Sequence, residues 1–325
     1  MEIVLNKILV IQTAFIGDVI LATALIEKLH ASFPKAKIDF LVRGGNESLV
    51  KDHPFVNEVI VWHKKENKYK NLFSLAKEIR KTKYDYVINL QRFMASGFLT
   101  WRSKAKHRIG FKKNPLSFFY TEKFPHEIGN GQHEVERNQL LIEKITDSVA
   151  LKPKLHPSKS NYSKIESLKL DTEFIVVAPS SVWFTKQVPQ SKVIELINKQ
   201  SSTLQICLIG APSDFDYCQS ILDAVDHTNV INLSNKLNLL DSAVLIQNAK
   251  MSYVNDSAPL HIASAMNANV TAFFCSTVPE FGFGSLSDRS LIIQSEEKLD
   301  CRPCGIHGFK SCPKGHFKCG LNLKV

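Results

Sequence analysis

The chain has 325 residues, of which 44% are hydrophobic and 22% charged, and its formal net charge is +10. This length exceeds one typical domain and is ample for a buried core. The composition excludes a disordered chain, a collagen and a coiled coil, and no stretch approaches the roughly 18 consecutive apolar residues of a membrane span.

The first half of the chain alternates between apolar runs and helical patterns. Residues 7–12 are predicted to form a buried strand, and residues 18–33 a helix that Pro34 ends. Further strands are predicted at 38–42, 58–62, 84–90 and 107–111, and a further helix at 69–82. This alternation predicts a parallel sheet with helices on both faces.

Residues 151–173 break the pattern and are the predicted linker, because they hold two prolines and many Lys and Ser residues. The alternation then resumes. Strands are predicted at 174–178, 204–209, 230–233, 251–254 and 270–274, and helices at 190–199, 213–225, 239–247 and 259–266. We therefore expect two doubly wound α/β halves, whose ligands bind at the carboxyl ends of the strands.

The N-terminal apolar region is not predicted to be an export signal, since Gln12 and Asp18 interrupt it. We therefore expect a cytoplasmic location, in which disulfides are rare. Three cysteines lie among apolar neighbours and are predicted to be buried: Cys207, Cys218 and Cys275. The other four lie close to the C-terminus: Cys301, Cys304, Cys312 and Cys319.

The turn after the first predicted strand contains Gly17 and Asp18, at the start of a helix. Glycine permits close approach of a ligand, and an acid here can either cap the helix or carry chemistry. The patterns G-x-G-x-x-G and G-x-x-x-x-G-K-[ST] are both absent, which weakens dinucleotide and NTPase functions.

Two later strand ends also carry polar residues. Residues 179–189, which include Ser180, Ser181, Thr185 and Lys186, offer hydroxyls, amides and a cation that suit a phosphate, or form an ordinary polar loop. Residues 255–265 place four residues of interest at a helix N-terminus, where free amides can bind a diphosphate or a sugar: Asp256, Ser257, Ala258 and His261. A lone histidine such as His261 is equally compatible with packing.

These segments resemble the ADP-heptose:lipopolysaccharide heptosyltransferases of glycosyltransferase family 9, most closely the heptosyltransferase II branch. Residues 178–189, A-P-S-S-V-W-F-T-K-Q-V-P, resemble its A-P-G-S-x-W-x-T-K-x-W-P segment, and residues 255–265 resemble its D-[ST]-G-x-x-H-x-A-A segment. The opening Gly-Asp turn and the cysteine-rich tail resemble two further family features. Ser180, Val188 and Ala258 depart from the family's usual Gly, Trp and Gly, which leaves the fold assignment intact but affects the choice of donor sugar.

The resemblance implies a GT-B fold, in which two Rossmann-like domains face each other across a cleft. Residues 1–155 would bind the acceptor, and residues 156–325, with the tail at 301–319, the nucleotide sugar. The implied reaction is inverting transfer of a heptose from ADP-L-glycero-D-manno-heptose to the lipopolysaccharide inner core. No cofactor and no catalytic metal are implied, and the sequence Asp214-x-Asp216 lies in a predicted surface helix rather than in a metal motif.

The resemblance also implies roles for individual residues. Asp18 would be the general base and Lys186 would stabilise the diphosphate. Ser180, Ser181 and Thr185 would hold the same phosphates, Asp256 the sugar hydroxyls, and Ser257 with the amides after it, next to Ala258 and His261, the phosphates.

The basic charge points to an anionic acceptor. Residues 1–150 hold 24 Lys/Arg and 16 Asp/Glu, a net charge of +8, whereas residues 151–325 hold 17 and 15, a net charge of +2. Gly17 with Arg102, Lys104 and Arg108 would contact the acceptor, either Kdo-lipid A or its heptosylated form, at the periphery of the inner membrane. A solvated lysine-rich face is the alternative, and no nucleic-acid fold surrounds these residues.

Three alternatives stay open from the sequence. The four tail cysteines could hold a structural zinc or be reduced, partly buried thiols. The enzyme could use another nucleotide sugar with the same fold. The chain could also be a non-catalytic binder of sugar nucleotides.

Overall fold

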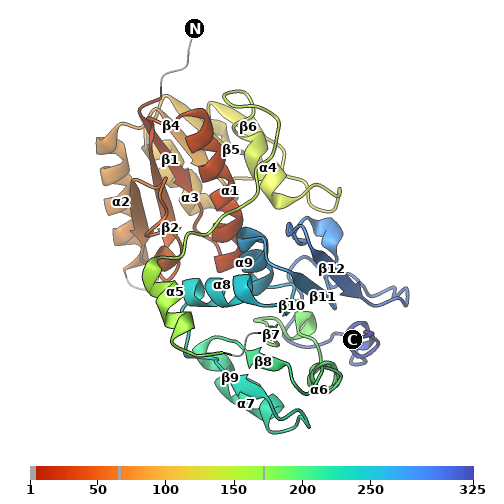
Figure 1. Cartoon of the computed structure of the whole chain (residues 1–325). Coiled ribbons are helices and arrows are strands. Elements are labelled where there is room, and N and C mark those ends of the chain that lie inside the picture. Colours follow the sequence, from red (N-terminus) through yellow and green to blue (C-terminus); the bar gives the residue numbers. More distant parts are fainter. Residues whose placement is uncertain (1–4, 65–66, 171–172) are drawn as a thin grey trace. The chain divides into compact units, whose positions relative to one another are not determined.

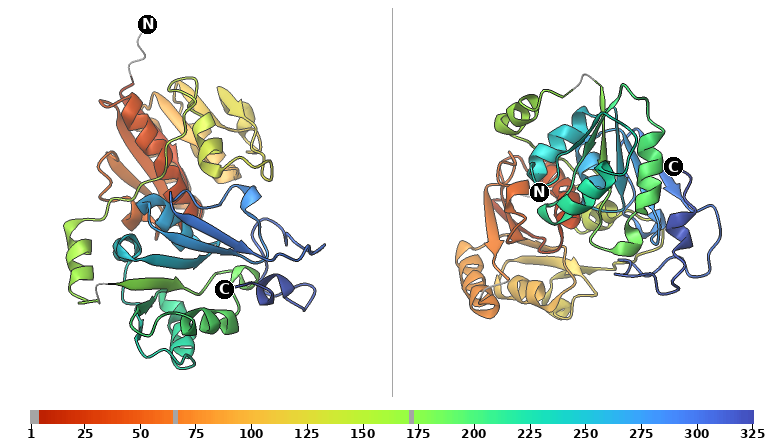
Figure 2. Two further views of the ribbon diagram at one scale, coloured as in Figure 1. Left: turned by 45° about the vertical axis from the view of Figure 1, so that its right-hand side comes forward. Right: turned by 90° about the horizontal axis from the view of Figure 1, so that it is seen from below.

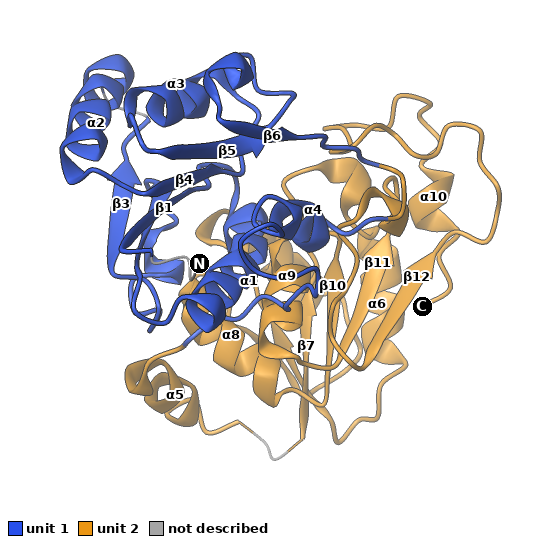
Figure 3. Cartoon of the chain, turned by 90° about the horizontal axis from the view of Figure 1, so that it is seen from above, with its two compact units in different colours: residues 1–128, 132–156 blue, residues 129–131, 157–325 orange. Residues whose placement is uncertain are grey.

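The computed structural model describes residues 5–64, 67–170 and 173–325 (Figure 1). The chain divides into two compact units, residues 1–128 with 132–156 and residues 129–131 with 157–325, which Figure 3 colours blue and orange. We call them unit 1 and unit 2. In each unit, helices cover both faces of a parallel sheet (Figures 1 and 2). The expected α/β class with two Rossmann-like domains is thus confirmed.

Unit 1 contains a six-stranded sheet in the order β3-β2-β1-β4-β5-β6. Its strands are β1 (Lys7–Ile11), β2 (Lys37–Arg43), β3 (Glu58–Trp62), β4 (Tyr86–Asn89), β5 (His107–Phe111) and β6 (Glu122–Phe124). Its helices are α1 (Ile16–Ser32), α2 (Lys68–Thr82), α3 (Met94–Arg102) and α4 (Glu134–Leu140), with short 3-10 turns η1 (Glu47–Leu49) and η2 (Ser117–Phe119).

The two faces of this sheet follow from the alternation of side chains along a strand. Leu9 and Ile11 of β1 pack in one core with the buried residues of α2 and α3, such as Leu75 and Leu99. α1 and α4 contact each other as the second helix layer. Because all strands are parallel, their carboxyl ends share one edge, and α1, α2 and α3 begin there.

Unit 2 has the same topology in the order β12-β11-β10-β7-β8-β9. Its strands are β7 (Phe174–Ala178), β8 (Gln205–Leu208), β9 (Val230–Asn232), β10 (Met251–Asn255), β11 (Val270–Phe274) and β12 (Ser290–Gln294). Its helices are α5 (Lys159–Glu166), α6 (Gln190–Asn198), α7 (Phe215–Leu222), α8 (Leu239–Asn248), α9 (Ala258–Met266) and α10 (Lys318–Leu321), with 3-10 turns η3 (Phe184–Lys186), η4 (Pro212–Asp214) and η5 (Pro279–Phe281).

The core of unit 2 includes part of the C-terminal tail. Phe317, Cys319 and Leu323 pack into the same hydrophobic cluster as Ile197 of α6 and Cys218 of α7. The prediction that Cys207, Cys218 and Cys275 are buried is confirmed, since each is 0% exposed.

The predicted strands and helices are confirmed to within a few residues at each end. The predicted linker at 151–173 is partly wrong, because α5 lies within it. The helix was missed because its Lys- and Ser-rich sequence has only a short apolar stripe. α3, α4, β6 and β12 were not predicted: α3 is short and mixes small with aromatic residues, and the two strands lie at the sheet edges. Within the described ranges, no helix has both the length and the apolarity to cross a bilayer.

Candidate functional site

An ion pair joins two strand ends at the carboxyl edge of unit 2. Lys186 Nζ lies 2.7 Å from Asp256 Oδ2, with side chains that are 15% and 7% exposed. Lys186 ends η3, which follows β7, and Asp256 directly follows β10, the neighbouring strand. Thr277, after β11, donates its hydroxyl to the same Asp256 oxygen at 2.6 Å. Three consecutive strands thus deliver a cation, an acid and a hydroxyl to one place.

Asn255, the last residue of β10, fixes the loop that carries Lys186. Its Nδ2 donates to the carbonyls of Ala178, Pro179 and Ser180, and its Oδ1 accepts from the Val188 N–H at 2.9 Å. Asn255 is 1% exposed, so these bonds form in a desolvated site where leaving them unmade would be costly. The sequence motif contained Asn255 without indicating this role.

The cysteine-rich tail completes the same region. Phe309 N–H donates to Thr185 Oγ1 at 2.7 Å, and Ser276 Oγ donates to the same oxygen at 3.0 Å. Gly308, with φ at +75°, lies so close that an added Cβ would meet Thr185 Oγ1 at 2.8 Å. Only glycine combines that backbone angle with that approach.

Arg302 holds the tail to the end of β11. Its guanidinium donates to the carbonyls of Phe274, Cys275 and Thr277 and to Gln294 Oε1, at 2.7–3.1 Å. Arginine alone offers enough planar donors for four such acceptors. No sequence pattern indicates this role, because every residue has a backbone carbonyl and its position in the fold cannot be read from the sequence.

The remaining residues predicted in unit 2 lie around this pair. Ser180 and Ser181 are half-buried in the loop after β7, and Ser181 N–H donates to Gln187 Oε1. Ser257 is the N-cap residue of α9 and Ala258 its first residue, so the free amides of that helix lie next to Asp256. His261 is 6% exposed and packs edge-on against Phe283.

In unit 1, Asp18 lies in the first turn of α1, after β1. Its Oδ2 accepts the Phe15 N–H at 3.2 Å, so Asp18 caps the helix, which is one of the two roles expected from the sequence. Burial, helped by the charge of Glu134, nevertheless raises its pKa to about 6. A half-buried carboxylate of this pKa is suited to accept a proton near neutral pH.

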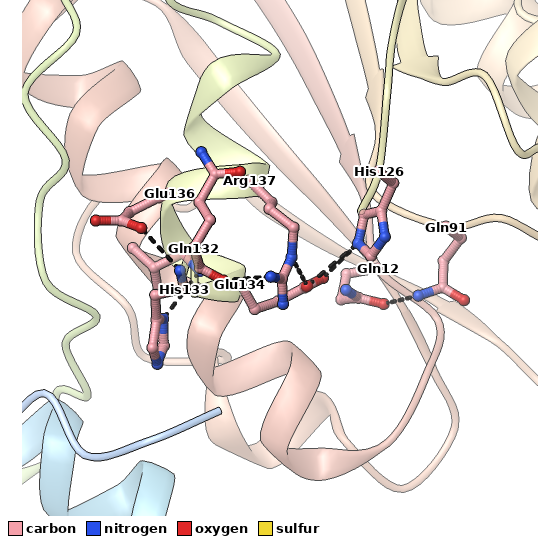
Figure 4. A network of polar contacts seen from close by, with 9 residues as sticks. Gln12, Gln91, His126, Gln132, His133, Glu134, Glu136 and Arg137 are labelled. Atoms are coloured by element: carbon pink, nitrogen blue, oxygen red, sulfur yellow. Dashed lines mark hydrogen bonds and ion pairs between the residues drawn. The ribbon is translucent and has the colours of Figure 1, made fainter. Parts of the chain in front are cut away.

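A buried network surrounds Glu134 at the same edge of unit 1 (Figure 4). Glu134 Oε2 accepts from Arg137 Nε at 2.8 Å and lies 3.2 Å from His126 Nε2. Burial opposes ionisation of Glu134, but the His126 hydrogen bond and the charges of His126 and Arg137 outweigh it and lower its pKa. Glu134 therefore stays charged and helps to raise the pKa of Asp18.

The structure does not bring the predicted acceptor residues together. Gly17 precedes Asp18 at the carboxyl edge of the sheet. Arg102 ends α3, Lys104 follows it, and Arg108 lies near the start of β5, so all three lie toward the opposite, amino edge. The Arg108 guanidinium also donates hydrogen bonds to the carbonyls of Phe119 and Ala105.

Other cations lie at the carboxyl edge itself, at or just after the ends of four strands: Arg43, Lys64, Arg92, Lys112 and Lys113. Their position after each strand was the available sequence signal. Lys64 donates to the Thr13 carbonyl at 2.6 Å, and burial lowers its pKa to about 8, which leaves it mainly protonated at neutral pH.

A pocket of about 550 Å³ opens beside Lys64 and Thr13. Apolar and aromatic side chains of α2 and α3 form most of its lining, and Lys64 and Lys68 supply positive charge. Nothing in the apolar periodicity of these helices predicts it, because it lies between their exposed ends.

One group of side chains in the described residues has ligand atoms within 4.8 Å of one another, as a metal ion would require: Glu27, His53 and His156. Its contacts fit an ion-paired cluster equally well. His156 Nε2 lies 2.9 Å and Lys154 Nζ 3.5 Å from the Glu27 carboxylate, and His53 Nδ1 accepts the Phe55 N–H. Burial lowers the pKa of His53 to about 4, so it is neutral at physiological pH.

Of the tail cysteines, Cys301 Sγ lies 3.8 Å from His316 Nε2.

Solved structures place this fold in a class. The glycosyltransferase family 9 protein from Veillonella parvula has a TM-score of 0.81 at 21% identity, covering 90% of this chain and 86% of that one. The Escherichia coli ADP-heptose lps heptosyltransferase II has a TM-score of 0.79 at 23% identity, covering 92% and 95%. Two doubly wound units of this kind define a GT-B protein.

The sequence comparison is more specific. The model of glycosyltransferase family 9 (heptosyltransferase) matches residues 72–306. Lipopolysaccharide heptosyltransferase 3 of Escherichia coli K12 is 27% identical over 278 residues, which is 80% of each chain. The chain therefore belongs to glycosyltransferase family 9, the heptosyltransferase family.

Proposed function

We propose that this chain is an inverting heptosyltransferase that uses ADP-L-glycero-D-manno-heptose and extends the inner core of lipopolysaccharide. The family match over residues 72–306 carries the proposal. The names of the relatives, which include lipopolysaccharide heptosyltransferases, support the acceptor. The name of the similar Escherichia coli structure, ADP-heptose lps heptosyltransferase II, supports the donor.

The donor is assigned to unit 2. Lys186, held by Asp256, would offset the charge that builds on the ADP phosphates as they leave. Ser180, Ser181 and the first amides of α9 after Ser257 would bind the phosphates, and Asp256 the sugar hydroxyls. Thr185 is 1% exposed and bonded to the tail, so its contribution would be to position Lys186. This arrangement would make a catalytic metal unnecessary.

The acceptor is assigned to unit 1. Asp18 would accept the proton of the acceptor hydroxyl while that oxygen forms a bond to the anomeric carbon and the carbon–phosphate oxygen bond breaks. Attack from the face opposite ADP inverts the anomeric centre. The cations at the carboxyl edge, such as Arg43, Lys64 and Arg92, would pair with the phosphates and Kdo carboxylates of the acceptor. Work at a lipid-linked acceptor implies contact with the inner membrane surface.

Donor selectivity is the decisive test. Thermal stability should be measured with ADP, UDP, GDP and CMP, because a ligand at a hundredfold excess over its dissociation constant stabilises the folded state by about 2.7 kcal/mol. We expect a selective rise with ADP, and transfer from ADP-heptose to Kdo-lipid A or to its heptosylated form in a direct assay. Selective stabilisation by another nucleotide would overturn the heptose donor. ADP binding without transfer to either acceptor would favour a non-catalytic binder.

A further inference from the structure

A continuous row of aromatic rings crosses the outer side of α2, α3 and η2 in unit 1. Phe73 of α2 contacts Phe98 of α3 at 5.4 Å between ring centroids, and Phe98 contacts Trp101 at 6.1 Å. Trp101 stacks on Phe119 of η2 at 4.5 Å, and Phe119 lies 4.2 Å from Phe118. Because α2 and α3 pack against each other, the row forms one surface. Figure 3 shows these helices on one side of unit 1.

Much of this surface is open to solvent. Tyr69, Phe73, Phe93, Met94 and Phe118 are 61–69% exposed. We call these five side chains the aromatic face. Four of them, all except Phe118, also line the 550 Å³ pocket, which continues the apolar surface inward. Contiguous exposed apolar surface of this kind usually marks an interaction site.

Cations border the aromatic face. Lys68 lies 5.6 Å from the Tyr69 ring and Arg102 lies 5.6 Å from the Trp101 ring. Lys70 in α2 and Lys104, Lys112 and Lys113 near α3 and η2 are exposed. Part of the basic stretch at 102–113 therefore lies along the row of rings, with Arg102 beside Trp101, and Lys112 and Lys113 in the segment that leads to η2.

We propose that the aromatic face docks on a bilayer that contains anionic lipids, with hydrocarbon entering the pocket. Aromatic side chains favour the boundary between headgroups and acyl chains. Lysine and arginine beside them gain electrostatic attraction to anionic headgroups. The mixture of rings and cations fits this occupant, because an apolar protein partner would leave the surrounding cations without counter-charges.

The inference rests on the proposed function, in that a lipid-linked acceptor explains why such a surface would be useful, but its test needs no acceptor. Binding should be measured by co-sedimentation with vesicles of phosphatidylethanolamine and phosphatidylglycerol, and with vesicles of phosphatidylcholine alone. We expect binding to the anionic vesicles and much weaker binding to phosphatidylcholine vesicles. Binding to the anionic vesicles should fall as salt is raised.

The double variant Tyr69→Gln with Phe73→Gln should weaken binding to anionic vesicles at least about tenfold. Glutamine maintains helix propensity, so α2 should still form. The matched control is Leu291→Gln with Leu321→Gln, which removes two apolar side chains of unit 2 that are 57% and 47% exposed. It should bind vesicles like the unchanged chain.

Equal binding by both double variants, or absence of binding by the unchanged chain, would overturn the proposal. Transfer to a deacylated, soluble acceptor without vesicles separates it from the proposed function. We expect a Phe118→Gln variant, which changes the one side chain of the aromatic face outside the pocket, to retain its kcat there. Absence of transfer by the unchanged chain would instead count against the heptosyltransferase assignment and leave the vesicle result standing.

Discussion

The carboxyl edges of the two sheets have the same topology but different chemistry. Each edge lies where the third, second, first and fourth strands of its unit end side by side. In unit 2 the site residues are paired with each other: Lys186 with Asp256, Asp256 with Thr277, and Asn255 with the loop. In unit 1, burial and the like charge of Glu134 outweigh the backbone donors and the charge of Arg92 around the central acid, Asp18. An apolar pocket opens in the same edge.

The difference indicates how one topology can serve two tasks. A charge that must be ready for a leaving group is best held rigid by neighbours before reaction. An acid that must accept a proton needs a raised pKa, so burial and like charge must outweigh the groups that stabilise its charge. Unit 2 shows the first arrangement and unit 1 the second.

Asp18→Asn would test the reactive side of this comparison, and we expect the largest effect. Transfer should fall about 10²- to 10⁴-fold, because asparagine cannot accept the proton. ADP binding, which is assigned to unit 2, should not change. A steady-state transfer assay and a calorimetric ADP titration would measure the two quantities.

Asp241→Asn is the matched control for helix capping. Asp241 occupies the same position in α8 as Asp18 in α1, and accepts the N-cap N–H of Asn238 at 3.0 Å. If its substitution reduced transfer as strongly, the loss in Asp18→Asn would reflect a damaged helix cap, and the base assignment would fail.

Lys186→Gln would test the rigid side. It removes the cation and leaves Asp256 buried with, among the residues that the structure describes, only the Thr277 hydroxyl as its side-chain partner. We expect kcat/KM to fall about 10²- to 10³-fold and ADP binding to weaken. Stability should also fall, by about 1–3 kcal/mol, because a buried carboxylate loses its counter-charge.

Lys192→Gln provides the comparison for this variant. Lys192 forms a 2.8 Å ion pair with Glu195 in α6, a pair that is more exposed and far less costly to break. Transfer by Lys192→Gln should equal that of the unchanged chain. An unaltered kcat/KM in Lys186→Gln would refute the role of the cation.

The strand and helix order of both edges could be predicted from the sequence, because apolar periodicity is a local signal. The polar residues at the strand ends, Asp18, Lys186 and Asp256, were found for the same reason. The link between Arg302 and the carbonyls after β11 could not be found, since it joins backbone atoms that no side-chain pattern reports.

The basic stretch at 102–113 shows a second limit of sequence reasoning. Charge density pointed to this stretch, but it does not indicate which end of a strand a residue occupies. α3, which was not predicted, runs back across the sheet and carries Arg102 to the amino edge. Because this helix was not predicted, Arg102, Lys104 and Arg108 were expected near Asp18, whereas they lie toward the opposite edge of the sheet.

Arg302→Lys would show whether the tail contributes to the rigidity of unit 2. A lysine ammonium cannot bond all four acceptors that the guanidinium holds. We expect about a tenfold loss of kcat/KM, mainly through KM for the donor, since Thr277 and hence Asp256 would be held less firmly. Vesicle binding, which is assigned to unit 1, should not change. An equal KM for the donor in Arg302→Lys and in the unchanged chain would contradict the positioning role of Arg302.

The smallest expected effect concerns the stability of unit 1 and has an unusual sign. The pKa of Asp18 is raised from 3.8 to about 6, so the folded chain binds a proton more tightly than the unfolded chain between these pH values. Stability therefore falls as pH rises through this window, and Asp18 is destabilising above about pH 6. The full shift corresponds to at most about 3 kcal/mol, which solvent access to the half-buried carboxyl reduces to about 1 kcal/mol.

Asp18→Asn should accordingly raise the apparent Tm at pH 7.5 by about 2–4 °C although it reduces transfer. The gain should shrink below about pH 5, where the wild-type carboxyl is protonated, and in the same range transfer by the unchanged chain should decline as the base is lost. Thermal scans of both proteins from pH 4 to pH 8 would measure this. A variant that is less stable at pH 7.5 would mean that the capping bond to Phe15 stabilises the chain more than the buried charge destabilises it. Asp18 would then be a stabilising residue, like the paired residues of unit 2, and the contrast between the two units would fail.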